Sequence, residues 1–326
     1  GDADDMRALL EDTVGEVDDA TISKNRMLSE LLGRVRQERF DQEIERLNDN
    51  QLAVCRAPYM ANLLVNAGPG SGKTHVLMMR CAYLIHRHRL SPADILVLAF
   101  NRAVVFEIRD RIRSLFRALG YGNYANRLDV STFHSFALRH QVSTDSYEED
   151  AIRDAVHQFA QAVTSDSATA ASVSRRYKAI LVDEFQDMNE DFYQVVINLS
   201  RHSNGGCMVI GDDDQDILAW NRRDWQQRYT QDVPVDGAKY FEAFKQQIDP
   251  IEHQLTLNYR STPEIVARAN RMIANVSSRI GFPRMKSNTE LEAFRDARGT
   301  VEIPFDSDQL FSLAMDSLGR GEHTAI

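Results

Sequence analysis

Short apolar runs alternate along the chain with stretches whose apolar residues recur at helical spacing. The run at Leu63–Val65 stops at Asn66, and the run at Ile95–Phe100 leads into a helical pattern through Val105 and Ile108. Continuous apolar runs of this length are typical of strands buried on both faces of a sheet. The predicted strands cover residues 63–66, 95–100, 128–131, 177–182, 207–211 and 251–257. Their alternation with helices predicts an α/β fold, a mainly parallel sheet with helices on both faces.

The flanking stretches follow weaker patterns. Residues 1–46 are acidic and carry leucines at helical spacing, which predicts an appended helical extension that packs through one face. A helix is predicted over 147–163, and the Ser/Thr/Ala-rich residues 164–174 that follow are predicted to form a surface linker. Near the end of the chain, residues 301–304 and 310–318 predict a strand and a helix.

A glycine-rich loop joins the first predicted strand to a helix. Its residues are Ala67, Gly68, Pro69, Gly70, Ser71, Gly72, Lys73 and Thr74. Backbone N–H groups of such a loop curl round a phosphate, and the helix end adds partial positive charge. Lys73 would then reach the β and γ phosphates of a nucleotide, and the Thr74 hydroxyl would bind Mg²⁺. A chance glycine-rich turn is the alternative, and position 67 lacks the usual glycine, but the strand and the helix on either side favour the nucleotide site.

Polar residues follow two later strands. Asp183 and Glu184 come directly after the strand at 177–182, and on an extended backbone they would point to opposite sides. One carboxylate would face Mg²⁺ and the other an attacking water. Gln215 follows the strand at 207–211 and is a candidate sensor of a γ-phosphate, although the three acids before it also fit a solvated turn.

Aromatic residues near the same strand ends are candidates for contact with nucleic acid. Phe100 closes a strand, and His134 lies between two phenylalanines, where a packed or capping role is also common. The only two tryptophans, Trp220 and Trp225, lie near several arginines. That composition suits base stacking with phosphate contact and suits an ordinary packing interface equally well.

Composition narrows the class of protein without deciding its ligand. The first twenty residues hold eight acids and one arginine, a net −7, so the rest carries only −3 of the total −10. Local basic strips remain compatible with DNA binding on such a background. Three scattered cysteines without a CxxC motif argue against disulfides and zinc, and no apolar run reaches bilayer length. We therefore expect an intracellular, cytoplasmic protein without a membrane partner.

The order of these motifs resembles that of the UvrD/Rep-type DNA helicases of superfamily 1, over residues 47–262. In that family the phosphate loop characteristically begins with alanine, in agreement with Ala67. Residues 48–51 resemble the family's adenine-reading Q motif, which makes Gln51 a nucleotide-binding candidate. The resemblance implies a RecA-like α/β fold, and ATP and Mg²⁺ as cofactors.

The resemblance also assigns roles around the phosphates. Residues 183–187 resemble the Walker B motif, in which Asp183 holds Mg²⁺, Glu184 activates water and Gln186 couples two domains. Gln215 lies in a stretch that resembles the γ-phosphate sensor. Residues 258–260 resemble a motif whose tyrosine, here Tyr259, packs on adenine and whose arginine, here Arg260, stabilises the transferring phosphate.

On the DNA side, residues 99–102 resemble the family's first DNA-contacting motif and make Phe100 and Asn101 candidate contacts. Residues 131–135 resemble the next such motif and bring in His134. Trp220 stands where the family has a base-stacking aromatic residue.

The chain departs from the family pattern in three ways. Asn221 stands where the family usually has arginine, and the interval between Ser135 and Tyr177 is too short for the helical insertion that grips duplex DNA. The family's last two motifs are absent. We therefore expect an acidic extension (1–46), a RecA-like ATP-binding domain (47–256, with a shortened insertion at 141–176) and the beginning of a second RecA-like domain (257–326).

The implied function is that of an ATP-dependent 3′→5′ DNA helicase or translocase motor, acting on single-stranded DNA or a single/double-strand junction together with further domains of the same polypeptide. Lys73, Glu184, Gln215 and Arg260 are its expected catalytic residues, and residues 1–326 alone are expected to be weakly active. Two alternatives remain: an ATPase switch in a repair or defence complex without unwinding, and a non-catalytic docking fragment.

Overall fold

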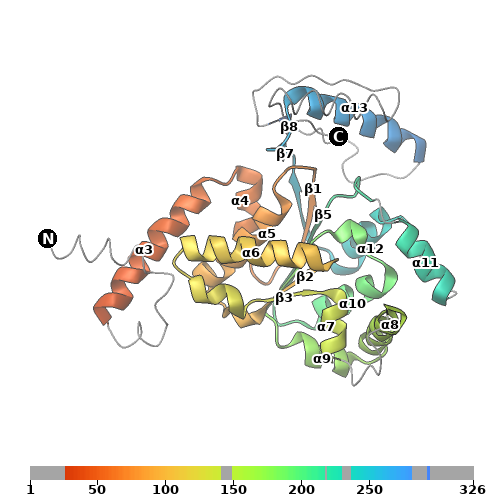
Figure 1. Cartoon of the computed structure of the whole chain (residues 1–326), viewed down its shortest axis with the longest axis horizontal. Coiled ribbons are helices and arrows are strands. Elements are labelled where there is room, and N and C mark those ends of the chain that lie inside the picture. The colour runs from red at the N-terminus through yellow and green to blue at the C-terminus, as the bar shows by residue number, and fades with distance from the viewer. Residues whose placement is uncertain (1–25, 141–148, 217–218, 230–235, 281–291, 294–326) are drawn as a thin grey trace.

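The computed structural model describes residues 26–140, 149–216, 219–229, 236–280 and 292–293. Its centre is a six-stranded sheet in the order β3-β2-β4-β5-β1-β6, and all neighbouring strands are parallel. The strands are β1 (Leu63–Ala67), β2 (Ile95–Ala99), β3 (Asp129–Thr132), β4 (Ala179–Val182), β5 (Gly206–Gly211) and β6 (Ile251–Leu255). The predicted mainly parallel sheet is confirmed, and helices connect its strands (Figure 1).

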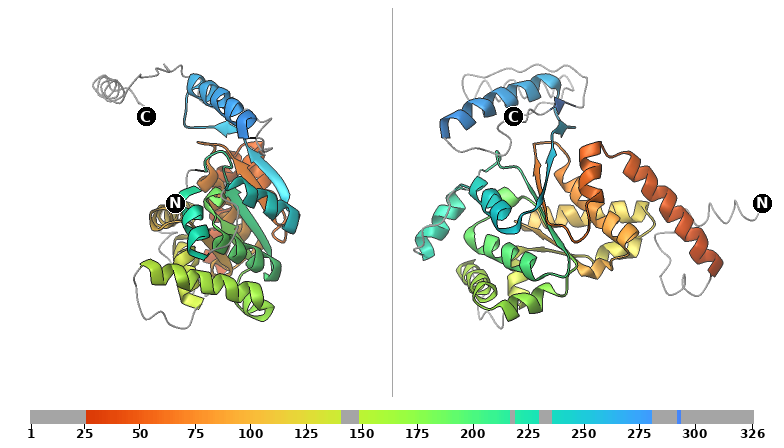
Figure 2. Two further views of the ribbon diagram at one scale, coloured as in Figure 1. Left: turned by 90° about the vertical axis from the view of Figure 1, so that its right-hand side faces the viewer. Right: turned by 180° about the vertical axis from the view of Figure 1, so that it is seen from behind.

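Helices cover both faces of this sheet, as the three views in Figures 1 and 2 show. The described helices are α3 (Arg26–Glu45), α4 (Asp49–Arg56), α5 (Lys73–His88), α6 (Arg102–Ala118), α7 (Phe133–His140), α8 (Glu149–Ser165), α9 (Ser167–Ser174), α10 (Glu190–His202), α11 (Ala219–Tyr229), α12 (Ala238–Ile248) and α13 (Pro263–Ile280), with short 3₁₀ turns η1 (Pro92–Asp94), η2 (Gly122–Arg127) and η3 (Phe185–Asp187). Helices α3 to α6 pack on one face, and α7 to α10 with α12 pack on the other.

The strands are apolar throughout because successive side chains pack into two different hydrophobic cores, one on each face of the sheet. Leu63 and Val65 of β1 lie in the cluster with α3 to α6, whereas Leu64 lies in the cluster with α7 to α10. All three are fully buried. Side chains alternate between the faces of a strand, so a sheet covered on both sides needs apolar residues at every position.

Residues 164–174 do not form the predicted surface linker. Most of the stretch is helix α9, whose first turn is capped by Asp166 through bonds from the N–H groups of Ala168 and Thr169. Ala170 and Val173 are buried against the second core. Alanine is the strongest helix former, and a good cap compensates for the scarcity of large apolar residues.

The chain leaves the main sheet after β6. β7 (Leu257–Asn258) pairs in parallel with β8 (Glu292–Ala293), and α13 lies beyond the carboxyl ends of β1 and β6 (Figure 1). The strand predicted over 251–257 is therefore split between two sheets. The elements predicted at 301–304 and 310–318 lie outside the described residues, so the boundary of a second domain at 257 stays a prediction. Across the described ranges, no helix is both long and apolar enough to span a membrane.

Candidate nucleotide-binding site

The loop between β1 and α5 is curled as a phosphate cradle requires. Gly70 and Gly72 adopt φ values of 68° and 85°, in the region that favours glycine. The Ser71 hydroxyl donates to the Gly68 carbonyl at 2.6 Å and closes the turn. Helix α5 begins at Lys73, so Lys73 and Thr74 occupy its first turn, where backbone N–H groups have no helical acceptor.

Gln51 binds this loop from α4. Its Nε2 donates to the Ser71 carbonyl at 3.1 Å, and its Oε1 accepts from the Asn48 N–H at 3.2 Å. Asn48 in turn accepts from the Gln51 N–H, so the two residues form a capping box at the start of α4. The buried amide of Gln51 is thus held beside the loop. An amide has two donor hydrogens and two acceptor lone pairs, and these two bonds use one of each.

The segment after β6 lies directly on the loop. The Tyr259 N–H donates to the Gly70 carbonyl at 2.9 Å, and Asn258 Nδ2 donates to the Pro69 carbonyl at 2.7 Å. A Cβ added at Gly70 would lie only 2.9 Å from Arg260 Cβ. Glycine is therefore needed at position 70 for two reasons: the positive φ of the loop, and the close approach of residues 258–260 to it. The segment therefore brings Tyr259 and Arg260 to the phosphate loop.

Asn48 completes this contact by donating to the Tyr259 hydroxyl at 2.6 Å. Three segments that are far apart in the sequence thus meet at one place: residues 48–51, 67–74 and 258–260. Asn258 and Asn48 are not among the predicted site residues. The Asn-Tyr-Arg motif is visible in the sequence, but only the tertiary structure shows that its asparagine holds the loop.

The two carboxylates after β4 differ sharply in environment. Asp183 is buried, and its Oδ1 accepts from the Glu184 N–H at 3.0 Å. Burial, followed by the Glu184 charge, raises the pKa of Asp183 to about 7. Glu184 adopts the left-handed conformation (φ 51°), so the premise of an extended backbone at this position is wrong. The left-handed turn places Glu184 Oε2 3.6 Å from Lys73 Nζ.

The oxygen donors here fit a magnesium ion. Within the described residues, Asp183 Oδ2 and Asp187 Oδ1 are buried without a hydrogen-bond partner. Burying a carboxylate oxygen without a partner costs free energy of folding. A hard cation such as Mg²⁺ takes oxygen ligands, so its binding to such an oxygen would offset that free energy. Burial, with the Glu184 charge, also raises the pKa of Asp187 to about 7. Asp183, with the Thr74 hydroxyl from the first turn of α5, would hold the ion.

Gln186 links the ends of β4 and β5. Its Nε2 donates to Glu184 Oε2 at 2.7 Å, and its Oε1 accepts from the Asp212 N–H at 2.9 Å. Asp212 and Asp213 after β5 are buried, so the solvated turn considered for them is wrong. The Gln215 N–H donates to the Asp212 carbonyl at 3.0 Å, and this places the sensor candidate in the same turn.

Three of the DNA-side candidates share a second region, a cleft of about 700 Å³ bounded by the start of α6, the end of β3, α8, α10 and α11. Phe100, Asn101 and His134 all line it. The rings of Phe100 and His134 lie edge-on to Phe192, at 6.0 Å and 5.3 Å between centroids. Asn101 also caps α6 by accepting from the Val104 N–H at 2.9 Å.

Residues 47–148 and 141–229, more than half of the chain, match the UvrD/REP helicase N-terminal domain. The chain belongs to this family. It is 27% identical to DNA helicase II of Escherichia coli over 320 residues, which cover 73% of this chain and 42% of that protein. It is 25% identical to ATP-dependent DNA helicase PcrA of Staphylococcus aureus over 300 residues, covering 67% of this chain and 38% of that protein. It is also 40% identical to ATP-dependent DNA helicase SRS2 of Saccharomyces cerevisiae over 96 residues, covering 29% of this chain and 8% of that protein.

The predicted membership of the UvrD/Rep-type helicases and the RecA-like α/β fold are therefore confirmed. The chain spans less than half the length of the DNA helicase II it matches. The family match ends at residue 229 and begins at residue 47, so α3 lies outside it.

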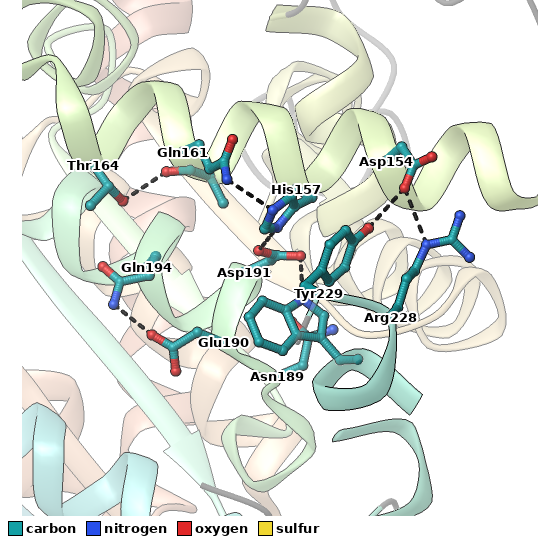
Figure 3. Close-up of polar contacts among 12 residues, drawn as sticks. Asp154, His157, Gln161, Thr164, Asn189, Glu190, Asp191, Gln194, Arg228 and Tyr229 are labelled. Carbon is teal, nitrogen blue, oxygen red and sulfur yellow. Dashed lines mark hydrogen bonds and ion pairs between the residues drawn. The ribbon is translucent and has the colours of Figure 1, made fainter. Parts of the chain in front are cut away.

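In this UvrD-type domain, α11 is fastened to α8 and α10 by buried side chains. Trp225 Nε1 donates to Asp191 at 2.5 Å, and His157 Nδ1 binds the same carboxylate at 2.8 Å. Figure 3 shows His157 between Asp191 and Tyr229, whose ring stacks on it at 3.7 Å between centroids. Trp225 is therefore part of a packing interface, which decides between the two interpretations offered for it.

The arginines around Trp225 are also engaged within the protein. Arg222 is buried and donates to the carbonyls of Gln186 and Met188. Arg228 pairs with Asp150 and with Asp154, the second contact being drawn in Figure 3. The remaining DNA candidate, Trp220, lies in the first turn of α11, and its side chain lies outside the described part of the structure.

Proposed function

We propose that this UvrD-type domain is the ATP-hydrolysing motor of a DNA helicase or translocase. The observation that supports this most strongly is the meeting of the phosphate loop with Glu184 and Tyr259. Lys73 Nζ lies 3.6 Å from Glu184 Oε2, and the Tyr259 N–H is bonded to the Gly70 carbonyl at 2.9 Å. A lysine for phosphate and a carboxylate for water thus lie within reach of one substrate.

The loop and its lysine would bind the triphosphate. Backbone N–H groups of the curled loop and the start of α5 attract phosphate oxygens, and Lys73 would hold the β and γ phosphates. Asp183 and Thr74 would hold Mg²⁺, which when bound offsets the charge that develops on the transferring phosphoryl group. Gln51 and Tyr259 would contact the adenine, beside the loop they already touch.

Glu184 would accept a proton from the attacking water. Its carboxylate contacts the Lys73 ammonium and the Gln186 amide. We infer that the nucleotide phosphates take over Lys73 and leave Glu184 available to the water, with Gln186 fixing its orientation. Gln215 would contact the γ-phosphate, and Arg260 would add positive charge to the transition state, as arginines do in related phosphoryl-transfer sites.

Single-stranded DNA, or its junction with duplex, would bind at the carboxyl edge of the sheet, beside Phe100, Asn101 and His134 and on Trp220. The shared cleft that three of these residues line supports this. The family resemblance supports 3′→5′ movement, and the scattered cysteines without a CxxC motif support a cytoplasmic location. Residues from 257 onward would begin a second RecA-like domain, since β7 leaves the main sheet there.

Two variants of the full-length polypeptide test this function. Lys73→Ala should lose tight Mg-ATP binding, and Glu184→Gln should bind ATP but not hydrolyse it. ATP turnover by Glu184→Gln at the parental rate would remove Glu184 from the proposed role.

A second candidate keeps the ATPase but lacks unwinding. The observation that favours it is the short region between β3 and β4: α8 and α9 pack closely against α10 in the second core. A domain built in this way has less protein with which to grip duplex DNA. A strand-displacement assay with the full-length polypeptide separates the two functions, because only a helicase releases the displaced strand.

A further inference from the structure

A second cleft, of about 450 Å³, lies between α3 and the amino ends of β2 and β3. Ser91 and Pro92 line it just before β2 begins, and Arg127 lines it just before β3 begins. The strands are parallel, so this edge of the sheet is opposite the carboxyl edge that holds the nucleotide and DNA candidates. Helix α3, which supplies one wall of the cleft, lies outside the residues that match the family.

The lining of this cleft is basic. Arg36, Arg89, Arg127 and His86 line it, and no aspartate or glutamate of the described residues does. Burial, and then the charges of Arg87, Arg89 and Arg36, lowers the pKa of His86 to about 4. Burial is the largest cause of this shift; the arginine charges add to it, and the Asp41 charge opposes them. Arginines gathered in this way would attract an anion.

Two arginines in the cleft are stacked on tyrosines. The Arg36 guanidinium lies 4.5 Å from the centroid of the Tyr121 ring, and that of Arg127 lies 5.6 Å from the centroid of Tyr124. The two tyrosine rings are 5.1 Å apart. Arg36 is further fixed by its Nε, which donates to the Gly120 carbonyl at 2.7 Å. A guanidinium oriented in this way presents several N–H donors in one plane, a geometry that matches a phosphate group.

Arg89 occupies a backbone position that favours glycine. It ends α5 in the left-handed conformation, φ 57°, and the Leu90 N–H closes the helix end on the Leu84 carbonyl at 3.2 Å. Its side chain is exposed, and among the described residues its guanidinium has no hydrogen-bond or ion-pair partner. The exposed guanidinium of Arg89 therefore adds a third positive charge to the cleft, beside the two stacked arginines.

We propose that this cleft binds the phosphate groups of a nucleic-acid backbone. Arginines oriented by tyrosine rings, together with the exposed guanidinium of Arg89, are the chemistry of phosphate recognition. The relatives of this domain are DNA helicases, so nucleic acid would pass near the domain. The site would hold a strand at the edge of the sheet opposite the motor, and its binding does not depend on ATP hydrolysis.

Arg89→Gly tests the proposal without damaging the fold. Glycine is preferred at this backbone position, so the variant should melt at the same temperature as the parent or higher. It removes one charge from the cleft. Fluorescence anisotropy with a labelled oligothymidylate, without nucleotide, should show several-fold weaker binding. The slope of log affinity against log salt should fall by about 0.7 for each phosphate that the variant no longer binds. Arg127→Gln should act in the same way.

Arg34→Gln is the matched control. Arg34 is an exposed residue of α3 that does not line the cleft, and its loss changes the net charge equally. If Arg89→Gly and Arg127→Gln bind the oligonucleotide as the parent or as Arg34→Gln does, the proposal is wrong. The loss should persist in a Phe100→Ala background, which separates this cleft from the motor's DNA path. A peptide of residues 2–20 that binds the cleft more tightly than the oligonucleotide would identify the chain's own acidic segment as occupant and overturn the proposal.

Discussion

Replacing Glu184 with glutamine should have two opposite effects on the ATPase cycle. The amide cannot accept a proton from water, so hydrolysis should fall by about 10²- to 10⁴-fold, the usual contribution of a positioned general base. ATP binding should become tighter, because the negative charge that competes with the phosphates for Lys73 is removed.

The size of the second effect follows from the geometry. At 3.6 Å between Lys73 Nζ and Glu184 Oε2, the gross attraction is about 1 to 5 kcal/mol for effective dielectric constants between those of water and of a protein surface. The Glu184 side chain keeps 28% of its surface exposed, and solvent screening therefore reduces the net value. A remaining ~1 kcal/mol corresponds to about fivefold tighter ATP binding.

The assay is a titration with a fluorescent, slowly hydrolysed ATP analogue and Mg²⁺, paired with a phosphate-release measurement on the same protein. Glu252→Gln is the control, because Glu252 pairs with Lys245 on the surface and lies away from the loop. A tenfold weaker affinity in Glu184→Gln would refute the competition for Lys73. An unchanged rate of hydrolysis would refute the role of the carboxylate.

Four further variants test separate parts of the site. Lys73→Ala should abolish tight Mg-ATP binding, and calorimetry that finds the parental affinity would contradict this. Burial and the Glu184 charge raise the pKa of Asp183 to about 7, so the folded chain holds a proton that the unfolded chain releases above about pH 4. Without Mg²⁺, stability should therefore fall as pH rises from about 4 to about 7, and Asp183→Asn should lessen that fall in thermal melts. Gln186→Ala should cost about 1–3 kcal/mol of unfolding free energy in urea, because it removes the acceptor of the buried Asp212 N–H and one of the two contacts of the Glu184 carboxylate; an unchanged midpoint would show that the bridge contributes nothing. Phe100→Ala should weaken single-strand binding by about 1–3 kcal/mol if the ring stacks on a base, whereas Phe106→Ala, at an exposed position of the same region, should not.

Local features of the site were predictable because their causes are local. The run from β1 through the glycines to Lys73 specifies strand, turn and helix within a dozen residues or so, and the structure has all three. The parallel sheet followed from apolar strands alternating with helices. In contrast, α9 escaped prediction because its stability depends on Asp166 as a cap and on small residues that pack closely, and neither produces an apolar pattern.

Contacts between distant segments were not predictable from spacing. Nothing in the sequence indicates that Asn258 donates to the Pro69 carbonyl, 189 residues away. Trp225 could be placed near arginines by sequence, but its bond to Asp191 and its burial depend on how α11 meets α10. The left-handed Glu184 is likewise a tertiary outcome, since glutamate rarely adopts that conformation and the surrounding contacts must maintain it.

Whether this domain is a DNA-dependent ATP motor can be decided by measuring phosphate release from ATP by the full-length polypeptide, with and without single-stranded DNA. We predict Mg²⁺-dependent hydrolysis that single-stranded DNA stimulates strongly and that Lys73→Ala abolishes. Hydrolysis that is absent, or that persists in Lys73→Ala, or that does not respond to DNA, would contradict the proposed function.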